Sequence, residues 1–258
     1  MGAVISSLFF AKLFEVSLPT IILAILALAV WTVYTMDHLW DAYRSQNPAK
    51  TFRHLFHQNN FLALSVLVVL GIASGVVMLW YLPTITRVWG IALTLVVIGY
   101  FIIVGFQQKS MYHKEIMVAL VYTCGVIMGP FSLYQGTLTT PHILVTIQFV
   151  VLAFSNLLLF SYFEMEIDLH QNFGSLARSI GKSMTRSLVM GMLIFVILTV
   201  SVCWLICSEL DVMMNSQWII LLMSFSLMAI FKWPEFFRQH DRYRFLGDGI
   251  FFIPVLVL

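Results

Sequence analysis

Seven runs of about twenty apolar residues limit what this chain can fold into. They cover residues 17–36, 59–81, 86–106, 115–135, 141–163, 187–208 and 216–233. A helix needs roughly 20 such residues to cross a bilayer. Hydrophobic residues make up 60% of the 258 residues and charged residues 10%, whereas a soluble domain carries about 25% charge. We therefore predict an all-α fold, a polytopic membrane helical bundle that forms one integral membrane domain over residues 1–258. Two shorter apolar runs, 2–11 and 245–258, raise the predicted helix count to about nine.

The basic residues predict the orientation of this bundle. Twelve of the fourteen Lys and Arg residues lie in four loops that alternate along the chain, 37–58, 107–114, 164–186 and 232–246. Loops rich in Lys and Arg face the cytoplasm. We expect a multi-pass protein of the cell inner membrane with these four loops on the cytoplasmic side.

Two pairs of acidic residues lie where long apolar runs end on that side. Asp37 and Asp41 follow the first long run, and Glu164 and Asp168 follow the fifth. The members of each pair are four positions apart, so they share one face of a helix. Unpaired carboxylates repel each other at this spacing, and Mg²⁺, which prefers oxygen ligands, would relieve the repulsion. The alternatives for the first pair are a solvated helix end and an ion pair between Asp41 and Arg44, three residues on.

The two pairs also suggest a repeat. They are separated by about half the chain, and each is followed by some twenty polar residues with three basic side chains and then by another apolar run. A duplicated bundle would give this order, with a site where its halves meet. We therefore predict two halves, 1–114 and 115–258.

Other polar residues on the same side have weaker interpretations. Arg53, Lys114 and Lys182 are candidates for binding phosphate or diphosphate beside the metal; attraction to anionic lipids is the alternative. Glu166 should point away from Glu164 and Asp168, toward solvent or a basic residue. A further set is interpreted as interfacial polar residues: His38, His54 and His57.

Both acidic segments resemble the motifs of the UbiA-type intramembrane prenyltransferase family. The first family motif, Asn-Asp-x-x-Asp-x-x-x-Asp, falls on Val33, Tyr34, Asp37 and Asp41. The second, Asp-x-x-Asp-x-x-x-Asp, falls on Ser161, Glu164 and Asp168, and the Gly174-Ser175-Leu176-Ala177 and Ile180-Gly181-Lys182 segments resemble the stretch next to it in the family. The last two acids of each motif are kept, and the leading positions are replaced by Val33, Tyr34 and Ser161.

The resemblance implies a fold, a cofactor and a reaction. It implies about nine helices around a central cavity, and transfer of a prenyl group from a prenyl diphosphate to a lipophilic acceptor. It implies that Mg²⁺ is held by four catalytic carboxylates, those of Asp37, Asp41, Glu164 and Asp168. Arg53, Lys114 and Lys182 would bind the diphosphate.

Two other functions fit the same residues. An ion-coupled transporter would use the acids as a relay, but the loops of the opposite side hold few ionisable groups: Glu15, Arg87, Glu209 and Asp211. A non-catalytic lipid-binding relative would keep the fold without the chemistry.

Overall fold

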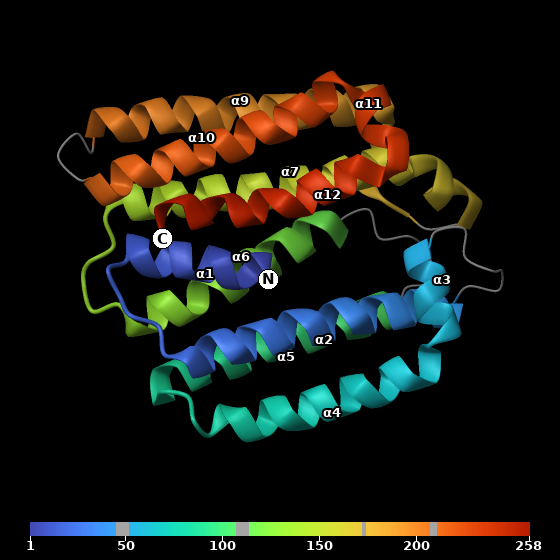
Figure 1. The fold of residues 1–258 in the computed structure, drawn as a ribbon, viewed down its shortest axis with the longest axis horizontal. Coiled ribbons are helices and arrows are strands. Elements are labelled where there is room, and N and C mark those ends of the chain that lie inside the picture. Colours follow the sequence, from blue (N-terminus) through green and yellow to red (C-terminus); the bar gives the residue numbers. More distant parts are fainter. Residues whose placement is uncertain (45–51, 107–113, 172–173, 207–210) are drawn as a thin grey trace. The chain divides into compact units, whose positions relative to one another are not determined.

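Helices are the only regular secondary structure in the part of the chain that the structure describes. The computed structural model describes residues 1–44, 52–106, 114–171, 174–206 and 211–258 (Figure 1). The α-helices are α1 (Gly2–Leu13), α2 (Thr20–Arg44), α3 (Phe52–Asn59), α4 (Phe61–Leu79), α5 (Thr84–Phe106), α6 (Lys114–Leu133), α7 (Thr140–Gln171), α8 (Leu176–Ile180), α9 (Lys182–Ile206), α10 (Asp211–Lys232), α11 (Pro234–Arg238) and α12 (Arg242–Gly249). Two 3₁₀ helices, η1 (Gln239–Asp241) and η2 (Ile250–Val257), complete the order.

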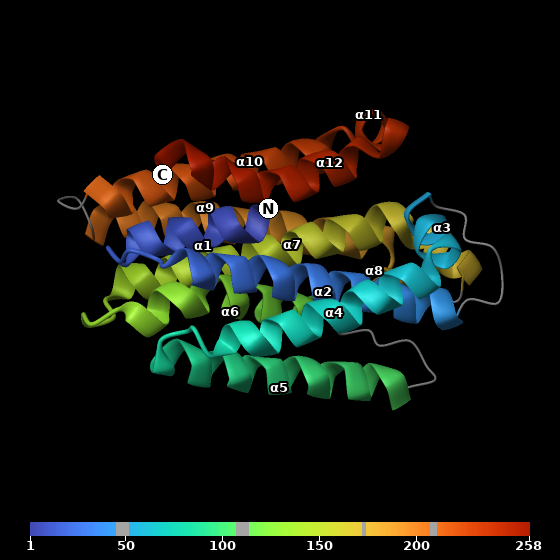
Figure 2. The ribbon, with the colours of Figure 1, turned by 60° about the horizontal axis from the view of Figure 1, so that its bottom comes forward.

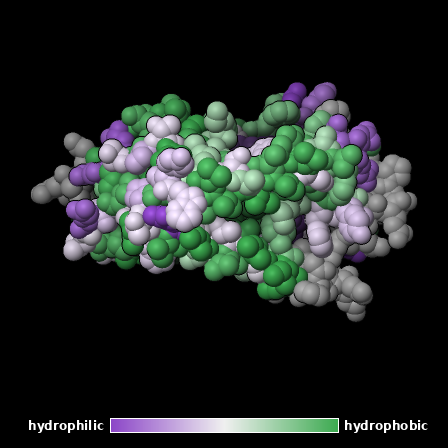
Figure 3. All heavy atoms as spheres, turned by 90° about the horizontal axis from the view of Figure 1, so that it is seen from below, coloured by the Kyte–Doolittle hydropathy of each residue, from purple (hydrophilic) through white to green (hydrophobic). Residues whose placement is uncertain are grey.

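Seven of these helices are long and apolar enough to cross a membrane. They are α2, α4, α5, α6, α7, α9 and α10, and they coincide with the seven runs expected from the sequence. The polytopic helical membrane bundle is thereby confirmed. On the face drawn in Figure 3, hydrophobic residues prevail. The count of nine is not reached among the described residues: α1 has only 12 residues, and the C-terminal run is divided between α12 and η2.

The chain divides into two compact units. Unit 1 comprises Met1–Leu18 and Trp89–Leu258, and unit 2 comprises Pro19–Val88. The duplication into halves 1–114 and 115–258 remains a prediction.

The core of unit 1 is built on α7. This helix packs against α6, α9 and α10 (Figures 1 and 2), and half of its most apolar window is buried, compared with 11% for α2. α9 shows why these helices associate, since its buried residues recur every three or four positions and form one stripe. The stripe consists of Thr185, Val189, Leu193, Val196, Val200 and Cys203.

A polar contact joins three helices inside this apolar core. The side-chain amide of Gln148 on α7 donates to Gln217 Oε1 on α10 at 3.0 Å and to Thr199 Oγ1 on α9 at 3.2 Å. Both glutamines are fully buried. Polar side chains between membrane helices typically form such interhelical hydrogen bonds, so Gln148 fixes the relative positions of α7, α9 and α10.

Unit 2 is held together by the contact between α2 and α4. Gly71 makes this approach possible, because a Cβ atom at this position would lie 3.2 Å from Thr32 Oγ1 and 3.3 Å from the ring of Trp31. Small residues let membrane helices come this close. The rest of α4 exposes apolar side chains such as Leu62 and Val69, as expected for a surface that faces lipid.

Two helices continue well past the apolar runs that predicted them. α2 extends to Arg44 and α7 to Gln171, so both acidic pairs lie inside helices and not in the loops that come after them. Loss of hydropathy ends a membrane-spanning run, but it does not end the backbone hydrogen bonding of the helix.

Candidate functional site

In unit 2, one histidine joins the first acidic pair. Single ligand atoms of Asp37, His38 and Asp41 all lie within 4.8 Å of one another on the last turns of α2. The helix brings the two carboxylates to one face, as their spacing predicts. His38 is buried, whereas the two aspartates are half-buried. The sequence interpretation of His38 as an interfacial residue missed this arrangement.

These donors fit a divalent cation closely but not perfectly. Two oxygens that bind the same Mg²⁺ at about 2.1 Å lie at most about 4.2 Å apart. The spread of 4.8 Å therefore requires side-chain movements of a few tenths of an ångström. An imidazole beside two carboxylates also suits Mn²⁺ or Zn²⁺.

A group of rings packs behind this cluster. His57 on α3 is buried, and its ring lies edge-on to that of His38, with centroids 4.8 Å apart. Tyr34 contacts His38 at 4.3 Å and His57 at 6.4 Å between centroids. Tyr34 and His57 therefore both pack on the His38 ring and help to fix its position.

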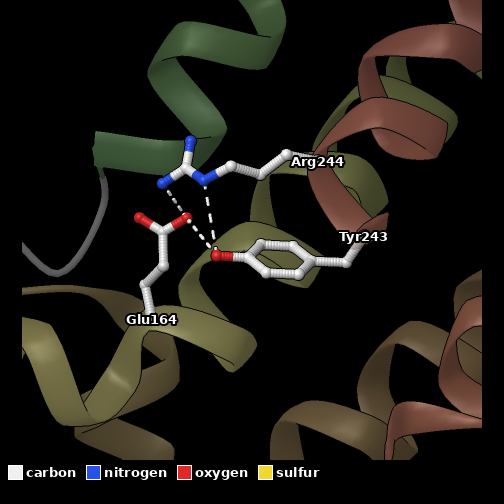
Figure 4. A network of polar contacts seen from close by, with 3 residues as sticks. All are labelled: Glu164, Tyr243 and Arg244. Carbon is white, nitrogen blue, oxygen red and sulfur yellow. Dashed lines mark hydrogen bonds and ion pairs between the residues drawn. The ribbon is translucent and has the colours of Figure 1, made fainter. Parts of the chain in front are cut away.

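In unit 1, the second acidic segment is held by the C-terminal part of the chain. Glu164 accepts a hydrogen bond from the hydroxyl of Tyr243 at 3.2 Å and forms an ion pair with Arg244 (Figure 4). Both charged side chains are largely buried, 14% and 19% exposed. The Tyr243 ring stacks on Phe163 at 4.4 Å between centroids, so α12 is fixed against the end of α7 by packing and charge together.

The environment of Tyr243 favours its neutral form. Burial raises the pKa of its hydroxyl to about 12, and the nearby negative charge of Glu164 acts in the same direction. Tyr243 therefore remains a hydrogen-bond donor to Glu164 over the whole physiological range.

A further carboxylate lies beside the second acidic segment, and the sequence interpretation did not include it. Glu115, in the first turn of α6, is buried, and its Oε1 accepts hydrogen bonds from the Ser161 hydroxyl at 2.8 Å and from the Leu176 backbone N–H at 2.9 Å. Its Oε2 is buried without a hydrogen-bond partner among the described residues. A carboxylate at the start of an apolar run was the sequence signal for it.

A side-chain cap and a glycine turn fix the path of the chain between α7 and α9. Ser175 caps α8, because its hydroxyl accepts a hydrogen bond from the Arg178 N–H at 3.3 Å. Gly181 separates α8 from α9 with φ of +82°, a conformation that side chains other than glycine rarely adopt. The resembling Gly-Ser-Leu-Ala and Ile-Gly-Lys segments thus serve as a cap and a turn, and they position Leu176 against Glu115.

The three residues predicted to bind diphosphate lie in different environments or outside the described residues. Lys182 forms an exposed 2.7 Å ion pair with Glu166, which confirms that Glu166 pairs with a basic residue. Lys114 begins α6, directly before Glu115. The side chains of Arg53 and Asp168 lie outside the described residues, as does that of Arg44.

Asp37 and Asp41 belong to unit 2 and Glu164 to unit 1, so the convergence of the two pairs remains a prediction.

Comparison of the chain with protein-family models, with curated proteins and with solved structures gave no match.

Proposed function

We propose that the protein is a divergent UbiA-like, Mg²⁺-dependent intramembrane prenyltransferase. It would move a prenyl group from a prenyl diphosphate to a lipophilic acceptor. The observation that carries the proposal is the close grouping of Asp37, His38 and Asp41 at the end of an apolar helix. Such a place can hold a metal-bound diphosphate while the attached chain remains among apolar side chains.

The second segment supports the proposal through Glu115. Ser161 stands where the family has an acid, and the carboxylate of Glu115 reaches the Ser161 hydroxyl from the neighbouring helix α6. A carboxylate is therefore present at this position although the motif residue is a serine. Glu164 and Asp168 would complete the acidic set on α7.

The chemistry depends on charge. Bound Mg²⁺ would stabilise the negative charge of the departing diphosphate. The carboxylates of this chain would hold the ion, and its cationic side chains, with Arg53, Lys114 and Lys182 as candidates, would bind the diphosphate oxygens. The apolar helices would exclude water from the allylic carbon.

A labelled-substrate experiment tests this function. Purified protein is incubated with Mg²⁺, radiolabelled prenyl diphosphates of several chain lengths and a lipid extract, and label transferred to lipid is measured. We expect transfer by the unmodified chain and at least a ~10²-fold loss in Asp37→Asn and Asp41→Asn, because each removes a charged metal ligand. Glu235→Gln, which neutralises an exposed acid on α11, should remain fully active. Failure to bind any prenyl diphosphate in the presence of Mg²⁺ would refute the proposal.

One observation favours a second candidate, a non-catalytic lipid-binding relative. Glu164 is already neutralised by Arg244, as in a structural ion pair. This candidate predicts that Asp37→Asn retains the cellular function of the protein.

A further inference from the structure

An open groove lies between α9 and α10 in unit 1. Its volume is about 310 Å³, and it is lined mainly by Arg186, Met190, Phe225, Met228, Lys232 and Trp233. The α10 residues recur at intervals of three or four positions, so they present one face toward α9. Met190 lies one helical turn from Arg186. The groove is therefore cationic at one end and apolar along the rest of its length.

The two cations of this groove differ from Lys182 and Arg244, the two basic residues whose ion pairs are described above. Lys182 is paired with Glu166, and Arg244 with Glu164. Among the residues that the structure describes, no carboxylate forms an ion pair with Arg186 or Lys232. Both side chains are exposed. Both are therefore accessible to an anion from outside the described chain.

A local role at a helix end explains only one of the two cations. Lys232 lies in the last turn of α10, where a positive charge interacts favourably with the helix dipole. Arg186 lies near the N-terminal end of α9, where a positive charge gains nothing from the dipole. Two cations from two helices, at one end of an apolar groove, match a phosphate group that carries an acyl chain.

We propose that this groove binds an anionic phospholipid. The phosphate lies between Arg186 and Lys232, and an acyl chain follows Met190 and Phe225. Trp233 marks the level of the headgroup, because tryptophan concentrates at the membrane–water interface; its ring also lies 5.2 Å from Lys232 Nζ. Basic pockets between membrane helices bind anionic headgroups in this way. The site uses none of the residues assigned to prenyl transfer.

Tryptophan quenching by brominated lipid tests the proposal, because Trp233 lines the groove. The purified full chain is reconstituted with phosphatidylcholine and increasing fractions of phosphatidylglycerol brominated on its acyl chains. The chain has seven tryptophans, so the Trp233 component is obtained by subtracting the signal of Trp233→Phe. Two basic side chains near an anionic headgroup predict roughly a 30-fold preference for brominated phosphatidylglycerol over brominated phosphatidylcholine.

Charge variants decide the outcome. Arg186→Gln/Lys232→Gln should abolish the preference, and Arg186→Lys/Lys232→Arg, which keeps both charges, should retain it. Arg238→Gln, which removes an exposed charge on α11 outside the groove, should leave the preference unchanged. Equal quenching by the two lipids in the unmodified chain would refute the proposal. An equal loss in Arg238→Gln and in the double Gln variant would also refute it, since the effect would then come from general surface charge.

Discussion

The hydroxyl of Ser161 on α7 donates a 2.8 Å hydrogen bond to Oε1 of Glu115 on α6. This contact joins Ser161 to a buried acid that the sequence interpretation did not include. The same oxygen accepts the Leu176 N–H, so α6, α7 and the loop before α8 meet at one carboxylate. Loss of a donor here leaves a buried polar atom less well satisfied than before.

Ser161→Ala should therefore destabilise unit 1. Hydrogen bonds to charged groups contribute about 1.5–3 kcal/mol, and we expect a loss of that size in the free energy of unfolding, measured by denaturant titration in detergent. Ser161→Thr keeps the hydroxyl and is the matched control. Equal stability of the two variants would show that the Ser161–Glu115 bond contributes little.

Arg244→Gln should lower the free energy of unfolding more than the loss of an equal charge at an exposed position. It leaves Glu164 buried without its cation, and breaking a buried ion pair from one side costs about 3–5 kcal/mol. Arg238→Gln, on exposed α11, should change the free energy of unfolding by less than about 0.5 kcal/mol. The double variant Arg244→Gln/Glu164→Gln should recover part of the loss; no recovery would mean that the two side chains are not coupled.

The raised pKa of Tyr243 predicts that the free energy of unfolding decreases at alkaline pH. Its folded pKa of about 12 lies above the ordinary value of 10.0, so the folded state retains a proton that the unfolded state releases. The stabilisation is complete below pH 10 and is lost as the pH rises toward 12. Unfolding measured from pH 9 to pH 12 should show a steeper decline for the unmodified chain than for Tyr243→Phe, which has no hydroxyl to titrate. Parallel curves would contradict this assignment.

The membrane-spanning helices were predictable because length and hydropathy suffice for them. Asp37 and Asp41 were likewise predictable as one helix face, since their geometry is local. The position of His38 beside them could not be predicted from the sequence. Neighbouring residues on a helix point in different directions, and only the side-chain conformation of His38 brings its ring to the carboxylates.

The contacts around Glu164 and Glu115 depend on tertiary structure. Tyr243 and Glu164 are separated by 79 positions and Glu115 and Ser161 by 46, so no short-range pattern connects them. Both α2 and α7 continue beyond their apolar runs, because loss of hydropathy does not end the backbone hydrogen bonding of a helix. A search for single acids in the first turn of apolar helices would have found Glu115.

His38 predicts the metal preference of the proposed site on α2. An imidazole donor favours Mn²⁺ over Mg²⁺ more strongly than carboxylates alone do. His38→Phe should therefore weaken Mn²⁺ binding at least ~10-fold and Mg²⁺ binding much less, measured by calorimetric titration of metal-stripped protein. Asp41→Asn should weaken both ions, and His57→Phe, which keeps the ring contact with His38, should change the Mn²⁺/Mg²⁺ ratio little. An unchanged ratio in His38→Phe would exclude His38 as a ligand.

Two glycines in α12 provide a test of how closely this helix must approach α7. A Cβ at Gly247 would lie 2.6 Å from both Asn156 Oδ1 and Phe160 Cε1, whereas a Cβ at Gly249 would have no neighbour within 4 Å. Gly247→Ala must displace the side chains of Asn156 and Phe160 or α12 itself, and overpacking of this kind costs about 1–3 kcal/mol.

Gly249→Ala meets no obstacle and should be neutral or stabilising by up to about 1 kcal/mol, because it restricts the unfolded chain. Thermal unfolding in detergent should thus give a lower midpoint for Gly247→Ala than for Gly249→Ala, although both variants add one methyl group. A shift of α12 would displace Arg244 from Glu164, and in that case Gly247→Ala combined with Arg244→Gln costs less than the sum of the single variants. Strict additivity would show that the helix contact and the ion pair are independent.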